Sequence, residues 1–100
     1  MKNETDLKMY IRKNVYNDGG VVLNIVGSGM QEPGWPDMYV AMPGGINGFI
    51  ETKWKKNKLS LIQEIRITRL KERGVKVLII RGEPGFKLPC KISEMLARGW

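Results

Sequence analysis

A glycine-rich segment of six residues, Pro43-Gly44-Gly45-Ile46-Asn47-Gly48, constrains the fold of this chain more than any other feature. It separates two apolar, strand-like stretches, Met38 to Met42 and Gly48 to Trp54. Glycine and asparagine tolerate the positive φ angles that tight turns need, and short β-prone runs on both sides of such a turn are typical of a hairpin. The sequence therefore predicts a β-hairpin at its centre and a sheet that contains it.

The segments on either side of the hairpin alternate between helical and strand patterns. We expect helices over residues 4–15, 60–73 and 91–98, further strands over 21–26 and 75–80, a loop over 27–34 and a turn at 83–85. The strand at 75–80 is almost entirely β-branched or aliphatic, which is typical of burial on both faces. The order αβββαβ followed by a last helix predicts an α/β fold with a mixed central sheet flanked by helices, in a single domain over residues 1–100.

Composition narrows the possible chemistry. There is one cysteine and no histidine, so neither an internal disulfide nor an imidazole zinc site is expected, and any metal would be held by oxygen, as Mg²⁺, Mn²⁺ and Ca²⁺ are. No run approaches the roughly 20 apolar residues of a membrane span, and the first residues lack the apolar stretch of a signal peptide. The expected location is the cytoplasm, without a membrane partner.

Seventeen Lys and Arg residues against ten Asp and Glu give a net charge of +7. The basic residues crowd into the segment 53–58, which favours a polyanionic partner, and nucleic acid is the commonest one. Lys55, Lys56, Lys58 and Arg66 are the expected contacts to its phosphates, and no element suited to reading bases is present. The alternative interpretation is a solvated loop that serves solubility.

Three residues of the hairpin could carry chemistry. Glu51 and Lys53 are two apart on a strand and so project from the same face, while Asp37 lies at the mouth of the preceding strand, where the hairpin can bring it beside Glu51. Two converging carboxylates repel each other unless a cation lies between them, and a hard divalent ion is the cation that such a pair would bind. Lys53 would then hold the attacking water or stabilise the transition state. The alternative is an ordinary solvated strand face, with Asp37 as a turn former after Pro36.

Four pieces of the sequence, in order, carry a family resemblance: GWPD, FIETK, LSLIQ and LKERGVKV. From Gly34 to Val77 the chain resembles the virus-type replication-repair nucleases (VRR-Nuc), a branch of the PD-(D/E)XK nuclease superfamily, in their stand-alone phage or bacterial form. The resemblance implies a restriction-endonuclease-like αβββαβ core and a Mg²⁺ or Mn²⁺ cofactor.

The resemblance also implies roles for individual residues. Asp37, Glu51 and the backbone carbonyl of Thr52 would be metal ligands, Lys53 the catalytic lysine, Gln63 a supporting residue on the following helix, and Glu4, or else Asp6, an acid on the first helix that reaches the metal. Two of these residues also suit a purely structural role. Ser60-x-x-Gln63 fits a capping box, and Glu4 suits the positive end of a helix dipole.

The implied function is that of a structure-selective DNA endonuclease in DNA repair or replication, most simply a homodimeric Holliday-junction resolvase of a bacterial or phage-infected cell. A four-way junction has two-fold symmetry, so two copies of one site suit it. The alternatives are a nuclease of the same fold directed at flaps, nicks or duplex, and a non-catalytic nucleic-acid-binding module.

Trp35 and Cys90 are less informative than the hairpin residues. Trp35 is expected to be a packing residue, with stacking on an unpaired base as the alternative. Cys90 has no histidine partner anywhere in the chain and is not expected to act as a nucleophile.

Overall fold

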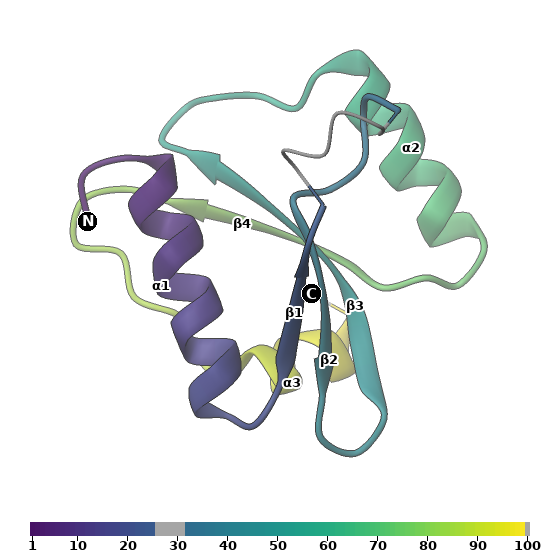
Figure 1. The fold of residues 1–100 in the computed structure, drawn as a ribbon. Helices are drawn as coiled ribbons and strands as arrows, with labels where there is room; N and C mark the ends of the chain where they lie inside the picture. Colours follow the sequence, from purple (N-terminus) through teal and green to yellow (C-terminus); the bar gives the residue numbers. More distant parts are fainter. Residues whose placement is uncertain (26–31, 100) are drawn as a thin grey trace.

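A computed structural model describes residues 1–25 and 32–99 of the chain (Figure 1). The elements are α1 (Glu4–Asn17), β1 (Val21–Asn24), β2 (Met38–Met42), β3 (Ile46–Trp54), α2 (Leu61–Glu72), β4 (Val77–Gly82) and α3 (Ile92–Arg98). This order confirms the predicted αβββαβ arrangement followed by a helix.

The four strands form one sheet in the order β1-β2-β3-β4. β1 pairs with β2 and β2 with β3 in antiparallel fashion, whereas β3 and β4 are parallel and are connected through α2. A parallel pair needs such a crossover, and a helix usually supplies it. The sheet is therefore mixed, as predicted, and β1 and β4 are its edges.

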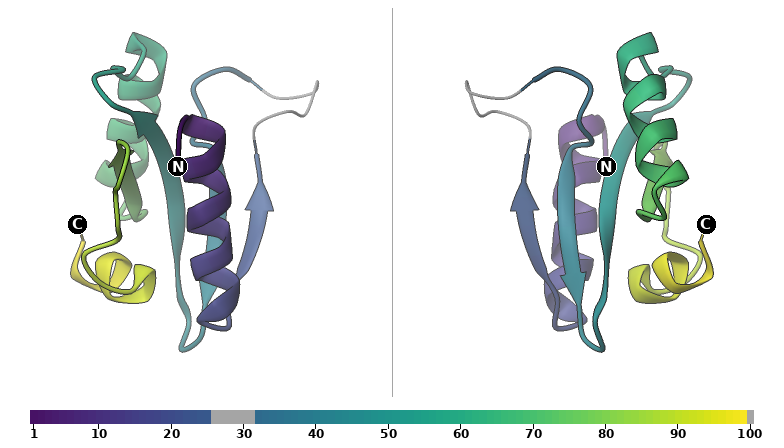
Figure 2. Two further views of the ribbon diagram at one scale, coloured as in Figure 1. Left: turned by 90° about the vertical axis from the view of Figure 1, so that its left-hand side faces the viewer. Right: turned by 90° about the vertical axis from the view of Figure 1, so that its right-hand side faces the viewer.

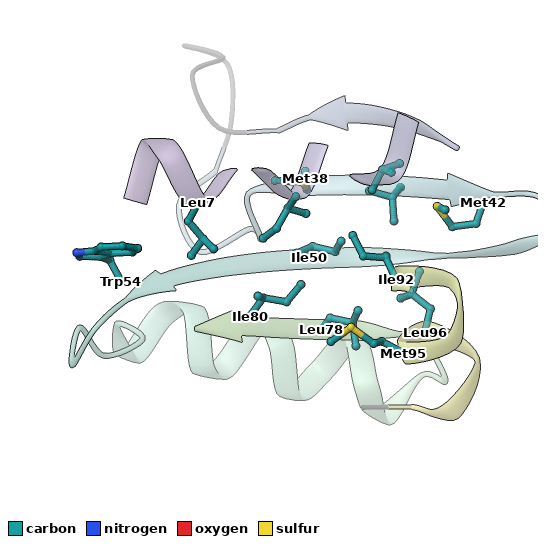
Figure 3. Packing of buried hydrophobic residues seen from close by; sticks show 13 residues of the cluster. Leu7, Met38, Met42, Ile50, Trp54, Leu78, Ile80, Ile92, Met95 and Leu96 are labelled. Carbon is teal, nitrogen blue, oxygen red and sulfur yellow. The ribbon is translucent and has the colours of Figure 1, made fainter. Parts of the chain in front are cut away.

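Helices cover both faces of the sheet. α1 lies in front of the sheet in one view of Figure 2, and α2 lies in front of it in the opposite view. The main core lies between the sheet and the α1 face, where α3 packs as well; Figure 3 shows this cluster. Its members are Leu7, Ile11, Val15, Met38, Val40, Met42, Ile50, Trp54, Leu78, Ile80, Ile92, Met95 and Leu96. Ile50 and Trp54 thus point away from α2, and Glu51 and Lys53 take the opposite face, as the alternation along the strand predicts.

Some element ends differ from the prediction. β3 begins at Ile46 rather than Gly48, because Ile46 and Asn47 pair with Met42 and Ala41 of β2. The turn is consequently shorter, and Gly44 and Gly45 both have positive φ. β1 ends at Asn24, whereas the predicted strand continued to Val26, which is outside the described residues.

The prediction that the last strand is buried on both faces was wrong. β4 runs from Val77 to Gly82, two residues later than predicted, and it is an edge strand. Ile79 remains 39% exposed because α2 covers only part of that face. No helix within residues 1–25 and 32–99 is long and apolar enough to cross a membrane.

Candidate active site

The candidate site forms where β2 begins beside the second half of β3. The ladder between these strands ends at the pair Met38–Ile50, so Asp37 lies next to Glu51 but outside the regular pairing. The backbone N–H groups of Phe49 and Lys55 donate to Lys76 and Gly82 on the β4 side, at 2.9 and 2.7 Å. Because backbone groups alternate in direction along a strand, those of Thr52 point the other way, toward Asp37.

The Asp37 side chain occupies the position that a continued strand would take. Its Oδ2 accepts hydrogen bonds from the backbone N–H and the hydroxyl of Thr52, at 2.7 and 2.6 Å. The carboxylate is 9% exposed, and its Oδ1 lies 3.5 Å from the Nζ of Lys8 on α1. A carboxylate thus replaces a strand carbonyl as the partner of Thr52, and the carboxylate is fixed in position by those bonds.

Glu51 is the more deeply buried acid, at 1% exposure. Its Oε1 accepts a hydrogen bond from the backbone N–H of Asp37 at 3.1 Å, and its Oε2 lies 3.3 Å from the Nζ of Lys53. Burial, and after it the negative charge of Asp37, raise the pKa of Glu51 to about 7, although Lys53 acts in the opposite direction. The two acids therefore form an electrostatically costly pair that a cation would relieve.

Gln63 both contacts the acidic pair and caps α2, the two roles that the sequence left open. Its Nε2 donates to Glu51 Oε2 at 3.0 Å, which links α2 to the acidic pair. Its Oε1 accepts from the backbone N–H of Ser60 at 3.0 Å, while its own N–H donates to the Ser60 hydroxyl at 3.2 Å. This reciprocal arrangement is a capping box. The cap orients the amide so that its nitrogen faces Glu51.

The backbone geometry at position 34 explains why the GWPD segment begins with glycine. Gly34 has φ +94°, and a Cβ placed there would lie 2.9 Å from the carbonyl oxygen of Ile62 on α2. Only glycine permits this close approach of the backbone in that conformation. Gly34 therefore lets the segment that leads to Asp37 pass directly against α2.

Solved structures share this arrangement of elements. One described as a VRR_NUC domain superposes with a TM-score of 0.69 at 26% identity, over 82% of this chain and 87% of the other. The fold is that of a VRR-Nuc domain. Hjc of the archaeal hyperthermophile Archaeoglobus fulgidus, a Holliday junction resolvase, superposes with a TM-score of 0.59 at 20% identity, over 82% of this chain and 70% of the other. No family model and no curated protein matches the sequence. The resemblance inferred from the sequence is confirmed by these structures.

In this VRR-Nuc fold the first helix contributes a lysine to the site. Glu4 and Asp6 lie in the first turn of α1, where the Asp6 carboxylate accepts from the backbone N–H of Lys2 and the Asp6 N–H donates to the Asn3 side chain. Lys8, one turn beyond Glu4, is the α1 residue that reaches Asp37. Within the described parts of the chain, no group of three His, Cys, Asp or Glu side chains is placed to hold a metal ion. The structure thus does not bring Glu4 or Asp6 to the acidic pair.

The donor atoms of this candidate site nevertheless fit a hard divalent cation. They are oxygens only: the carboxylates of Asp37 and Glu51, which the structure brings together, and the backbone carbonyl of Thr52, which the family resemblance implies as a third ligand. Such ions keep several water ligands and need only one or two carboxylates from the protein. A cavity of about 240 Å³ beside Asp37, lined also by Lys8, Arg12 and Asn24, leaves room for water and a phosphate group. The two carboxylates therefore suit a hard divalent cation.

The predicted phosphate contacts fall into two groups. Lys55, Lys56 and Lys58 are exposed on the loop that follows β3. Arg66 is already engaged: it donates to Glu32 at 3.1 Å and to the Pro33 carbonyl at 3.1 Å, and its guanidinium lies 4.6 Å from the ring centre of Trp35.

Trp35 itself is half-buried and its ring lies 5.7 Å from that of Phe49, as a packing residue would. The sequence did not identify Lys8 or the Thr52 hydroxyl as parts of the site. The only hint for Lys8 was its place next to Leu7 in the buried stripe of α1.

Proposed function

We propose that this chain is a divalent-metal-dependent, structure-selective DNA endonuclease, acting as a homodimeric Holliday-junction resolvase with residues 1–100 as one nuclease domain. The observation that carries the proposal is the convergence of Asp37, Glu51, Lys53 and Gln63 at one end of the sheet of a VRR-Nuc fold. The Holliday-junction activity of Hjc, which shares the fold, supports the choice of substrate.

The chain's own residues divide the work of phosphodiester hydrolysis. Lys53 is 13% exposed at the side chain and held against Glu51, so its ammonium is positioned to orient a water molecule or to stabilise charge that develops on the phosphate. Gln63 and Thr52 fix the orientations of the two carboxylates. A bound divalent ion would supply a water of lowered pKa and neutralise negative charge on the phosphate.

The substrate would be held mainly through its phosphates. The net charge is +7 for one chain and +14 for two, which is +7 twice. Lysines on the loop after β3 begin two residues beyond Lys53, where a strand that enters the site must pass. Binding of this kind releases counterions, so the affinity should fall steeply with salt.

Exposed apolar side chains offer a surface for the second copy. Leu61, Ile65 and Ile79 are 72%, 45% and 39% exposed, and they lie on α2 and β4. Ile79 pairs with Glu51 in the parallel ladder and so shares its face of the sheet. A dimer formed about a two-fold axis through this surface would bury these side chains and place two sites in symmetric positions.

The test is cleavage of a labelled four-way junction beside matched flap and duplex substrates, with Mg²⁺ or Mn²⁺ and with a chelator. Lys53→Ala and Glu51→Gln should abolish cutting but retain binding. Lys13→Ala, which removes an exposed lysine elsewhere on α1, should cut normally. Paired nicks near the branch point would support a resolvase.

Two other outcomes have clear meanings. Preferential cutting of flap or duplex, lost in the same variants, would retain the site and replace the substrate. Binding without cutting of any substrate under all metal conditions would contradict the enzyme and favour a non-catalytic nucleic-acid-binding module.

A further inference from the structure

A second cavity lies at the carboxyl ends of β3 and β4, beyond the candidate site. Its volume is about 610 Å³, and it is lined by Lys55, Lys56, Asn57, Arg81, Glu83 and Phe86. In Figure 1 this is the region where the arrowheads of both strands end, near the N-terminus of α1. The volume falls within the range of roughly 300–1,000 Å³ that is usual for clefts that bind small molecules.

Arg81 connects this cavity to the candidate site. It is the register partner of Lys53 in the parallel ladder, so both side chains leave the same face of the sheet. Its Nη1 donates to the backbone carbonyls of Lys55 and Asn57, at 2.6 and 2.5 Å. One guanidinium thus ties the basic loop after β3 to the neighbouring strand.

The loop is held in a conformation that needs such support. Lys55 has φ +54° and is the one non-glycine residue with positive φ among residues 1–25 and 32–99. Its N–H donates to Gly82 at 2.7 Å, and the N–H of Asn57 donates to Trp54 at 3.1 Å. Residues in this region of φ persist where their surroundings fix them, and they concentrate at functional sites. The loop is therefore built into a defined shape.

The chemistry of the lining suits a nucleotide. Three cations, Lys55, Lys56 and Arg81, face one acid, Glu83, so the cavity carries an excess of positive charge. The half-buried ring of Phe86 and the lysine stems add an apolar wall. Cations next to an aromatic surface match a phosphate joined to a sugar and a flat base.

We propose that this cavity is a nucleotide subsite, which takes one backbone phosphate of the DNA strand and the sugar or base attached to it. Arg81 is its positioning residue and holds the loop lysines in place for the phosphate. This subsite proposal rests on the proposed function, because it assumes that the strand entering the candidate active site is DNA.

Amide NMR spectra of isotope-labelled protein locate the subsite directly. The probe is a short single-stranded oligodeoxythymidylate, added in the presence of chelator to the Glu51→Gln protein, which should not cut. We expect shifts of the amides of residues 55–57 and of Gly82, Glu83, Gly85 and Phe86 that saturate with the oligonucleotide. Saturating shifts that leave these two segments unchanged would overturn the proposal. Because no cleavage is involved, this result is separate from the cleavage test above.

Three variants distinguish positioning from simple charge. Arg81→Met should weaken oligonucleotide binding about tenfold. It should also reduce the slope of the logarithm of affinity against the logarithm of salt concentration by about two, because the loop lysines lose their alignment as well. Arg81→Lys keeps the charge but cannot hold both carbonyls in the same geometry, so it should resemble Arg81→Met. Arg98→Met removes one exposed charge on α3 and should change affinity about twofold or less.

Wild-type binding by Arg81→Lys, or equal losses in Arg81→Met and Arg98→Met, would overturn the positioning role. Circular dichroism checks that each variant is folded. If the Arg81 variants do not fold, Lys56→Met, a change in an exposed loop side chain, takes their place. It should weaken binding more than Arg98→Met does, and equal effects would contradict the subsite.

Discussion

Each carboxylate of the candidate site has its own lysine. Lys8 lies 3.5 Å from Asp37 Oδ1 and Lys53 lies 3.3 Å from Glu51 Oε2. The two pairs differ in their surroundings. Asp37 also accepts two short hydrogen bonds from Thr52, whereas Glu51 is buried at 1% exposure beside the charge of Asp37. Glu51 is therefore the acid whose ionisation should oppose folding.

The pH dependence of stability tests this assignment. The pKa of Glu51 is about 7 in the folded chain against an ordinary value of 4.5, so between these pH values the folded state binds more protons than the unfolded state. The free energy of unfolding should therefore decrease as pH rises from 4.5 to 7, by up to about 3 kcal/mol, and level off above.

Denaturant titrations in chelator, repeated across this pH range, measure the decrease. Glu51→Gln has no such ionisation and should lose that part of the slope. A slope that survives in Glu51→Gln would assign it to another group.

Lys8 should compete with a metal ion for Asp37. An ion bound at Oδ1 must displace or share the contact with the Lys8 ammonium, so Lys8→Met should bind Mn²⁺ about two- to fivefold more tightly, as expected for losing a partly exposed ion pair. Calorimetric titration with Mn²⁺ measures the affinity, and Lys13→Met serves as the control on the same helix. Weaker binding in Lys8→Met would mean that Lys8 orients Asp37 for the metal.

At the scale of the elements, the N-terminus of α2 joins a helix cap to the site. Ser60→Ala removes the hydroxyl that accepts from the Gln63 N–H, and Gln63→Ala removes the amide that accepts from the Ser60 N–H, so each variant breaks one of the two bonds of the capping box. Loss of the Ser60 hydroxyl should cost about 0.5–2 kcal/mol in thermal or denaturant unfolding. Gln63→Ala alone also removes the hydrogen bond to Glu51, so only this variant should lower the cleavage rate, by about 10- to 100-fold. Equal rates for the two variants would restrict Gln63 to capping.

The sequence predicted the elements better than their ends. Turn residues and the apolar patterns identified the hairpin and the order of helices and strands, because both signals are local. The start of β3 and both ends of β4 were displaced by two residues because pairing with a neighbouring strand decides them. The exposure of Ile79 was not predictable for a similar reason: an aliphatic run does not reveal whether its strand lies at an edge.

The same distinction, between local sequence patterns and the packing of distant elements, applies to the candidate site. Asp37, Glu51 and Lys53 belong to one hairpin, so spacing alone could place them together. Lys8 and Arg81 reach the region from α1 and from β4, and only the packing of these elements on the sheet brings them there. The Thr52 hydroxyl contacts Asp37 because β2 begins where it does, which no local pattern specifies.

For the whole molecule, the proposed homodimer depends on the exposed apolar side chains of α2 and β4. Ile65→Asp would place a charge in the proposed contact between copies and should convert a dimer to a monomer, since a buried unpaired charge is costly. Light scattering after size exclusion measures the mass. Leu23→Asp, on the opposite edge strand where Leu23 is 63% exposed, is the matched control. A monomer produced only by Leu23→Asp would move the interface to β1.

The hairpin turn between β2 and β3 points away from the end of the sheet that holds the acids (Figure 1). A Cβ added at Gly44 or Gly45 would meet no atom within 4 Å. Exposed turns of this kind are where chains best accept inserted segments. A fluorescent or affinity peptide spliced between these two glycines would therefore report on the protein from a distance, with the end of the sheet that holds the acids and both chain termini left in their native form.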